Sequence, residues 1–159
     1  MTLENGSVLV TGGTRGIGKA IALRLASEGA SRIALGYLRN DKAAEAAADE
    51  IRAAGAEPIL VRGNVASEKV VAEFASHGPY AAVVHNAATG VIKPALETEA
   101  LDHFPNREQM LHAGKTRTPA GRLVEPEDVA GAVAFLCSPD ADMLRGHTLI
   151  MDGGYSLLA

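Results

Sequence analysis

A short apolar run that turns on glycines into a helix stands near the start of the chain. Residues 7–11 read Ser-Val-Leu-Val-Thr, and Gly12, Gly16 and Gly18 follow before an amphipathic stretch. Gly12 permits a sharp turn, Gly16 lets backbone approach a ligand closely, and Gly18 lets the helix pack against the strand. The first N–H groups of such a helix attract an anion. This stretch predicts a strand–turn–helix unit suited to a phosphate-bearing cofactor, although a structural turn without a ligand uses glycine in the same way.

Apolar runs and helical patterns alternate through the first half of the chain. Turn residues separate them, and Gly29 and Gly55 are suited to end helices. This alternation predicts an α/β fold, a Rossmann-like doubly wound parallel sheet of three layers with strand order 3-2-1-4. We expect strands at 7–11, 32–37, 58–62 and 80–86, and helices at 16–28, 41–54 and 68–76.

The alternation of apolar runs and helical patterns ends after residue 88. We expect a helix near 106–113, then one that begins at Glu125-Pro126 and ends by Ser138-Pro139, with its apolar side chains Val129, Val133, Phe135 and Leu136 toward the core. A strand is expected at 148–151. Because strand four would otherwise leave its outer backbone groups unpaired, this strand is expected beside it, which extends the order to 3-2-1-4-7. The alternative is that the neighbour of strand four lies outside this chain.

Composition limits the classes of protein. The chain has 159 residues with 47% hydrophobic and 21% charged side chains, which favours one ordered domain over residues 1–159. The net charge is −4 without a basic run, which argues against a nucleic-acid partner. One cysteine, no long apolar run and no metal spacing among the histidines predict no disulfide, no membrane span and no metal site. A cytoplasmic location is therefore expected.

Several motifs together resemble one family. Thr-Gly-x-x-x-Gly-x-Gly spans residues 11–18, His-Asn-Ala-Ala spans 85–88, and Pro-Ala-Gly-Arg and Asp-Gly-Gly follow at 119–122 and 152–154. This set resembles the short-chain dehydrogenase/reductase family, with Asn64-Val65 where the family usually has an Asp-Val pair that holds the adenine. The resemblance implies a dinucleotide site formed by Gly12, Thr14, Arg15, Gly16, Ile17, Gly18, Asn64, Val65, Asn86, Ala87 and Ala88.

Two further segments resemble one branch of that family. They are His-Phe-Pro-Asn-Arg-Glu at 103–108 and Ala-Asp-Met-Leu-Arg-Gly at 141–146, which are similar to the NADPH-linked enoyl-acyl-carrier-protein reductases. The resemblance implies an acyl thioester substrate, acyl carrier protein as a partner and a homo-oligomer. Reduction of a 3-oxoacyl thioester is the related alternative.

The sequence departs from the family where the proton-transfer residues are expected. The family uses a Tyr followed by a Lys on one helix, and none of Tyr37, Tyr80 and Tyr155 has a lysine four residues later. No catalytic residue is therefore assigned. A central block is expected to be missing, with the join near residues 97–101 and a Cα–Cα gap within 96–102 if the sequence joins two separate segments. The alternatives are a shortened, non-catalytic dinucleotide-binding protein and an inert deletion product.

The cofactor is expected to be NADP rather than NAD. Chains that bind NAD usually place an acid about twenty residues after the glycine loop, where it holds the ribose 2′-hydroxyl. Here that place reads Tyr37-Leu38-Arg39. A guanidinium from Arg39 or Arg15 matches a 2′-phosphate in charge and shape. The alternative is that Arg39 is a solvated surface charge and that Asp41 only caps the next helix.

Overall fold

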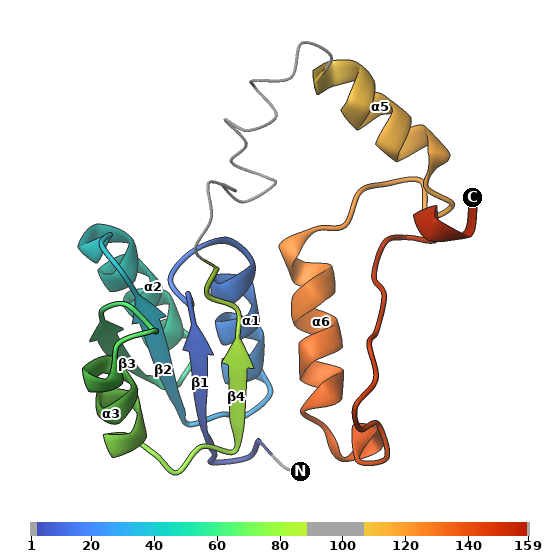
Figure 1. Cartoon of the computed structure of the whole chain (residues 1–159). Coiled ribbons are helices and arrows are strands. Elements are labelled where there is room, and N and C mark those ends of the chain that lie inside the picture. The colour runs from blue at the N-terminus through green and yellow to red at the C-terminus, as the bar shows by residue number, and fades with distance from the viewer. Residues whose placement is uncertain (1–2, 89–106, 159) are drawn as a thin grey trace.

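The computed structural model describes residues 3–88 and 107–158. A parallel sheet with helices on both sides occupies the first part, and helices joined by extended chain form the second (Figure 1). The expected join at 97–101 lies outside the described residues, as do the Cα–Cα test at 96–102 and Phe104. The elements are β1 Ser7–Thr11, α1 Gly16–Ser27, β2 Arg32–Tyr37, α2 Asp41–Ala53, β3 Glu57–Arg62, α3 Glu68–Ser76, β4 Ala82–His85, α5 Arg107–Arg117, α6 Pro126–Leu136, η1 Pro139–Ala141 and η2 Tyr155–Leu158.

The sheet has the order β3-β2-β1-β4, and all three pairings are parallel. Leu9 in the central strand β1 lies opposite Ala34 of β2 and Val83 of β4. Parallel neighbours need crossover connections, which α1, α2 and α3 supply, so the carboxyl ends of all four strands meet at one edge. The Rossmann-like prediction and the order 3-2-1-4 are confirmed.

The fifth strand expected beside β4 is not formed. Residues 148–151 are extended but pair with no described strand, and the side chain of Ile150 is 73% exposed. In Figure 1 this segment runs on the far side of α6 from β4. The argument for a partner assumed that the outer edge of β4 is buried. Val83 and His85 on that strand are exposed instead, so water can satisfy its backbone groups.

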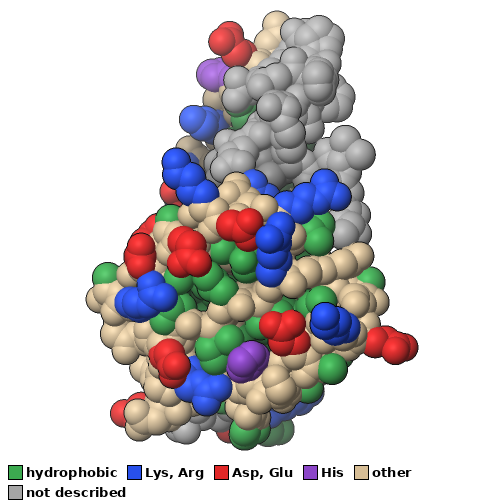
Figure 2. Space-filling view, turned by 90° about the vertical axis from the view of Figure 1, so that its left-hand side faces the viewer, with side chains coloured by type: hydrophobic (Ala, Val, Ile, Leu, Met, Phe, Trp, Pro, Cys, Tyr) green, Lys and Arg blue, Asp and Glu red, His purple; other side chains and the backbone are tan. Residues whose placement is uncertain are grey.

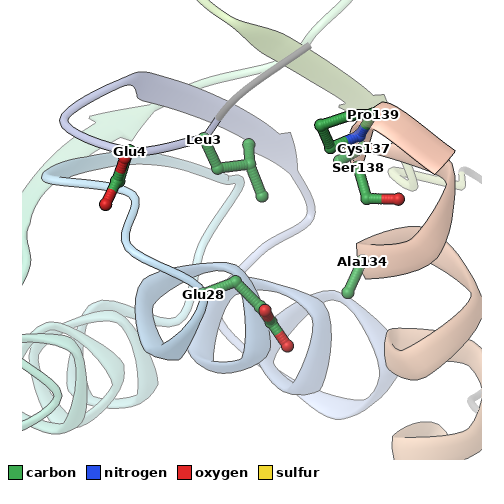
Figure 3. Close-up of a pocket in the computed structure, with 7 residues that line it drawn as sticks. All are labelled: Leu3, Glu4, Glu28, Ala134, Cys137, Ser138 and Pro139. Carbon is green, nitrogen blue, oxygen red and sulfur yellow. The ribbon is translucent and has the colours of Figure 1, made fainter. Parts of the chain in front are cut away.

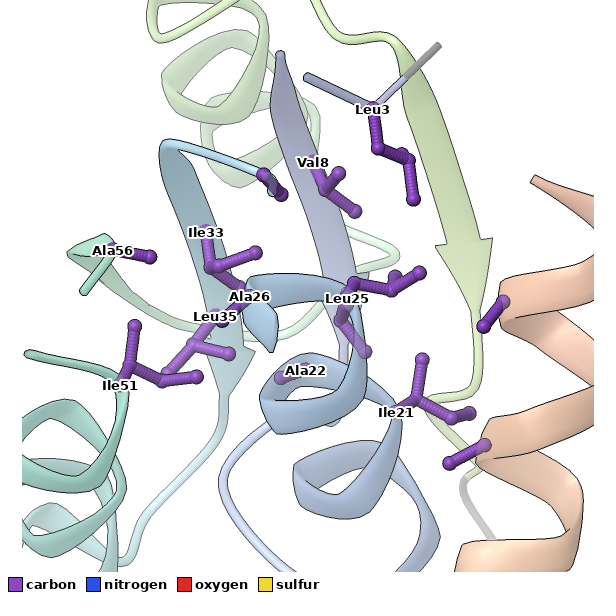
Figure 4. Close-up of a cluster of buried hydrophobic side chains, with 14 of the residues drawn as sticks. Leu3, Val8, Ile21, Ala22, Leu25, Ala26, Ile33, Leu35, Ile51 and Ala56 are labelled. Carbon is purple, nitrogen blue, oxygen red and sulfur yellow. The ribbon is translucent and has the colours of Figure 1, made fainter. Parts of the chain in front are cut away.

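Two apolar clusters hold the sheet to its helices. The larger one joins Val8, Val10, Ile33 and Leu35 to α1, α2 and α6 on one face, with Leu25 of α1 fully buried between them (Figure 4). The smaller cluster lies on the other face, where Phe74 and Val70 of α3 cover Leu9, Ala34 and Val61. Burial on both faces explains why the strands are nearly continuous apolar runs.

Helix α6 packs through small residues. Ala130 and Ala134 are buried, and Val129 and Val133 pack against the larger cluster as expected. Phe135 and Leu136 were expected toward the core and are instead 44% and 43% exposed. Side chains one turn apart share a face, and α1 lies close against the alanine face, so the bulkier pair points elsewhere. That expectation was wrong for these two side chains.

Candidate dinucleotide site

The turn after β1 has the backbone of an anion site. Gly12 and Gly16 adopt positive φ angles of 65° and 50°, which glycine takes without strain. Helix α1 begins at Gly16, and its N-cap residue Arg15 makes no side-chain capping hydrogen bond. Its first turn also contains no acid. The N-terminal N–H groups of α1 are therefore neither capped by the Arg15 side chain nor faced by a first-turn carboxylate, the condition under which a helix terminus favours an anion.

Close packing of α1 on the turn requires glycine at position 18. A Cβ there would lie 2.2 Å from the carbonyl oxygen of Gly12 and 2.5 Å from Nδ2 of Asn86. A Cβ at Gly12 would lie 3.0 Å from the same Nδ2 and 3.1 Å from Cα of Ala87. The turn, the start of α1 and the chain after β4 therefore pack so closely that a Cβ has no space at Gly18 and little at Gly12.

Hydrogen bonds between Thr11 and the chain after β4 fix this junction. The Thr11 hydroxyl accepts the backbone N–H groups of Asn86 (3.1 Å) and Ala87 (3.0 Å) and donates to the carbonyl of Val84 (3.3 Å). The Asn86 side-chain amide donates to the carbonyls of Thr11 and Gly12, both at 3.1 Å. Thr11 is 6% exposed. Asn86 therefore supports the glycine turn, and Thr11, absent from the predicted site, anchors both.

Arg15 and Arg39 stand at the carboxyl edge of the sheet, after β1 and β2. Both side chains are exposed, and within residues 3–88 and 107–158 neither has a carboxylate partner. Arginines elsewhere on the described surface do pair, for example Arg24 with Glu28 at 2.8 Å and Arg52 with Asp49 at 2.6 Å. Two unneutralised guanidinium groups at this edge suit a phosphate.

After β2, one residue caps α2, and a different residue binds Tyr37 and Arg62. The Asn40 side chain accepts the N–H of Ala43 at 2.9 Å, so Asn40 is the N-cap of α2. Asp41 is instead bound by Tyr37, whose hydroxyl donates to Oδ1 at 3.0 Å, and by Arg62, whose Nη1 lies 3.4 Å from Oδ2. The interpretation of Asp41 as the cap of α2 is therefore wrong, because Asn40 is the cap.

The other predicted residues are distributed around this edge. Thr14 is buried in the turn, and Ile17 is 41% exposed on the first turn of α1. Asn64 follows β3, where its Oδ1 accepts the N–H of Ala66 at 3.0 Å, and Val65 packs against the smaller apolar cluster. Ala88 is exposed at the end of the described chain after β4. All these positions follow carboxyl ends of neighbouring strands, the edge where ligands bind in such sheets.

The site residues fit a dinucleotide on these observations. The uncapped start of α1 offers backbone N–H groups to a pyrophosphate, and Arg15 and Arg39, which have no carboxylate partner among the described residues, offer positive charge to a further phosphate. The Asp41 carboxylate, which would oppose such a ligand, is bound by Tyr37 and Arg62.

The tyrosines lie in structural contacts. Tyr80 donates its hydroxyl to the carbonyl of Phe74 at 2.7 Å, and the Arg117 guanidinium lies 5.4 Å from the ring centroid of Tyr155. Burial raises the pKa of Tyr80, and burial together with the Asp41 hydrogen bond raises the pKa of Tyr37. A phenol with a raised pKa keeps its proton at neutral pH, so neither arrangement is that of an activated acid.

A separate cavity lies at the other end of α1. It has a volume of about 250 Å³ and is lined by Leu3, Glu4, Glu28, Ala134, Cys137, Ser138 and Pro139 (Figure 3). The twelve residues of α1 separate it from the glycine turn by about 18 Å. Cys137 is 7% exposed there, and burial raises the pKa of its thiol. This cavity is no part of the dinucleotide site.

Two further features of the described residues bear on function. None of the helices has the length and apolarity that crossing a membrane needs. No group of three or more His, Cys, Asp and Glu side chains gathers there in a way that would hold a metal ion. Acidic and basic side chains are mixed over the face that Figure 2 shows, rather than gathered by sign.

The family follows from comparison with known proteins. A family model described as short chain dehydrogenase matches residues 6–107. The chain belongs to the short-chain dehydrogenase/reductase family. A second model of this family, described as enoyl-(acyl carrier protein) reductase, matches residues 90–156. Members of the family are oxidoreductases that bind a nicotinamide dinucleotide, which agrees with the turn after β1 and with the residues that Thr11 joins to it.

Curated relatives of this short-chain dehydrogenase/reductase match about half of its length. An A-factor type gamma-butyrolactone 1′-reductase of Streptomyces virginiae is 34% identical over 87 residues, which is 55% of this chain and 32% of the relative. A 3-oxoacyl-(acyl-carrier-protein) reductase FabG of Staphylococcus epidermidis is 46% identical over 70 residues, which is 44% of this chain and 28% of the relative. The matched stretches thus span about a third of those relatives or less.

Solved structures agree with the fold. A short-chain dehydrogenase/reductase from Serratia marcescens superposes with a TM-score of 0.75 at 22% identity, covering 98% of this chain and 100% of that chain. A blue fluorescent protein from a metagenomic library, solved in complex with NADPH, gives a TM-score of 0.75 at 21% identity with the same coverage. At this identity the likeness establishes the Rossmann-like architecture.

Proposed function

We propose that this protein is an NADPH-dependent short-chain reductase of acyl thioesters, with an enoyl-acyl-carrier-protein as its substrate. The observation that carries the proposal is the uncapped, acid-free start of α1, together with Arg15 and Arg39, which stand at the same edge of the sheet and have no carboxylate partner in the described part of the chain. NADPH differs from NADH by a 2′-phosphate, which needs cationic partners. The match of residues 90–156 to an enoyl-(acyl carrier protein) reductase model supports the substrate class.

The chain's own residues supply binding and orientation. The N–H groups that begin α1 would hold the pyrophosphate, Arg15 and Arg39 the 2′-phosphate, and the backbone at 86–88 the adenine-side ribose, with Thr11 holding that backbone in place. When bound, NADPH supplies a hydride for the unsaturated carbon of the substrate. We assign no proton donor within this chain, because no tyrosine is followed by a lysine at family spacing.

Two alternatives have their own support. The 46% identity with a 3-oxoacyl reductase over 70 residues favours ketone reduction of a 3-oxoacyl thioester, which uses the same cofactor half. The absence of a Tyr-x-x-x-Lys pattern favours a chain that binds the dinucleotide without turning it over. Both alternatives keep the NADPH site and differ only in the chemistry after the dinucleotide has bound.

Titration of the full chain with NADPH, read by nucleotide fluorescence, tests the common step. Saturable binding that weakens with rising salt is expected, because phosphate contacts with arginine are screened. Oxidation of bound NADPH is then followed with crotonyl and acetoacetyl thioesters. Turnover of the crotonyl thioester alone supports the enoyl substrate, turnover of the acetoacetyl thioester supports the 3-oxoacyl alternative, and binding without turnover supports the non-catalytic one. No binding of NADPH would overturn the proposal.

A further inference from the structure

Three charged or polar side chains from three elements meet at Asp41, two residues after Arg39 in the chain. Tyr37 ends β2 and Arg62 ends β3, and the two are direct partners in the parallel register of these strands. Both reach Asp41 in the first turn of α2, where Tyr37 donates to Oδ1 at 3.0 Å and Arg62 Nη1 lies 3.4 Å from Oδ2. Each carboxylate oxygen of Asp41 is therefore engaged by a donor from a different strand.

Asp41 stands where an acid would change cofactor choice. It lies 23 residues after Gly18 and two after Arg39, just beyond the place where NAD-binding chains put the acid that holds a ribose 2′-hydroxyl. A free carboxylate there would repel a 2′-phosphate and attract the guanidinium of Arg39. The Asn40 side chain already caps α2, so the position of Asp41 is not explained by capping.

We propose that Arg62 is a positioning residue for cofactor selection, which acts by holding the Asp41 carboxylate, together with Tyr37, away from Arg39 and from the ribose. This inference rests on the proposed NADPH binding. Arg62 ends β3, while Arg39 follows β2 and, like Arg15, has no carboxylate partner among the described residues. Because Asp41 is neutralised and Arg39 is not, the end of β2 favours a ribose 2′-phosphate over a 2′-hydroxyl.

The size of the effect is bounded by exposure. The side chains of Arg62 and Asp41 are 59% and 56% exposed, and exposed ion pairs of this kind contribute little to stability alone. Loss of the Arg62–Asp41 ion pair should therefore leave the fold intact and change the affinity for the dinucleotide. We expect Arg62→Gln to lower the ratio of NADPH to NADH affinity about fivefold. Tyr37→Phe should act in the same direction.

The test measures dissociation constants for NADPH and NADH by fluorescence titration of the full chain. Arg62→Gln is compared in the native background and in Asp41→Asn, with Arg52→Gln as the matched control. Arg52 is an exposed arginine on α2, the helix of Asp41, and it pairs with Asp49 at 2.6 Å. The proposal predicts a lowered ratio for Arg62→Gln, little change when Asp41→Asn is already present, and none for Arg52→Gln. Equal melting temperatures exclude unfolding as the cause.

Two outcomes overturn this inference while leaving the proposed function standing. An unchanged ratio in Arg62→Gln means that Asp41 does not oppose the 2′-phosphate. An equal fall in both backgrounds means that Arg62 acts on the ligand directly, without Asp41. Failure of the wild-type chain to bind either dinucleotide overturns the proposed function instead, and this inference with it.

Discussion

The hydroxyl of Thr11 and the backbone of Asn86 join two strands that lie 75 residues apart in the chain. The Thr11 oxygen accepts the Asn86 N–H at 3.1 Å, and the Asn86 amide donates back to the Thr11 carbonyl at 3.1 Å. The same amide reaches the carbonyl of Gly12 at 3.1 Å. The position of the glycine turn is thus set by contacts with the neighbouring strand as well as by its own backbone.

Replacement of Thr11 by valine keeps the shape of the side chain and removes the oxygen. The N–H groups of Asn86 and Ala87 would then lose their acceptor in a partly buried place. We expect a loss of about 1–3 kcal/mol in the free energy of unfolding, measured by chemical denaturation, and weaker NADPH binding. Ser76→Ala on α3, whose hydroxyl donates to an exposed carbonyl of its own helix, should change stability by less than about 0.5 kcal/mol. Equal stability of the two variants would mean that water replaces the Thr11 oxygen.

Gly18→Ala tests the packing of α1 on the turn. The added methyl would lie 2.2 Å from the Gly12 carbonyl oxygen, so α1 must move away from β1. We expect a loss of about 1–3 kcal/mol in the free energy of unfolding together with weaker dinucleotide binding. Gly131→Ala within α6 is the matched control, because its Cβ meets nothing within 4 Å, and it should stabilise the chain by about 0.5–1 kcal/mol. A Gly18→Ala chain that binds NADPH as tightly as the wild type would contradict this packing argument.

The first half of the fold was readable from local patterns. Continuous apolar strands such as Val8–Val10 and the glycines at 12, 16 and 18 indicate a parallel sheet and its turn, because each signal lies within a few residues. The contact between Thr11 and Asn86 was not readable, since a hydroxyl's partner across 75 residues leaves no trace in local sequence. The same holds for Asp41, whose partner Arg62 is brought close by the pairing of β2 with β3.

The second half was read less well because its patterns are ambiguous. The run Thr148–Met151 has the composition of a strand, yet strand formation needs a partner edge, and α6 lies between this run and β4 in Figure 1. Phe135 and Leu136 are the bulkiest apolar residues of α6, yet alanines face α1. Hydrophobicity identifies candidates for burial, while the distance between packed helices decides which side chains fit.

The small-residue face of α6 leads to a prediction of its own. Ala130 is 3% exposed and packs in the larger apolar cluster, so Ala130→Leu adds volume where none is available. We expect a loss of about 1–3 kcal/mol in the free energy of unfolding. Phe135→Gln on the same helix should change it by about 0.5 kcal/mol or less, since that side chain is 44% exposed. The reverse ranking in chemical denaturation would show that Phe135 rather than Ala130 faces the core.

Titration of the Tyr37 phenol tests its hydrogen bond to Asp41. Burial, then the Asp41 hydrogen bond and charge, raise the pKa of Tyr37, whereas the Arg62 charge lowers it. Asp41→Asn should therefore bring the pKa of Tyr37 down, though burial keeps it above the ordinary value. Ultraviolet absorbance follows the phenolate, and a Tyr37→Phe chain identifies which of the three tyrosines moves. A titration unchanged by Asp41→Asn would show that the hydrogen bond is not formed in solution.

The acid at the start of α6 makes stability depend on pH. The Arg122 guanidinium, followed by the N–H of Glu125, holds the pKa of Asp128 well below its usual value of 3.8. A carboxyl whose folded pKa is depressed contributes stability that is complete above the unfolded pKa and is lost as pH falls toward the folded one. Asp128→Asn should therefore be less stable than the wild type by a constant amount above about pH 5, with the difference shrinking below about pH 4. Denaturation midpoints across this range measure it, and Arg122→Gln should reduce the same pH dependence. A difference that stays constant down to about pH 3 would show that the carboxylate is not held by these partners.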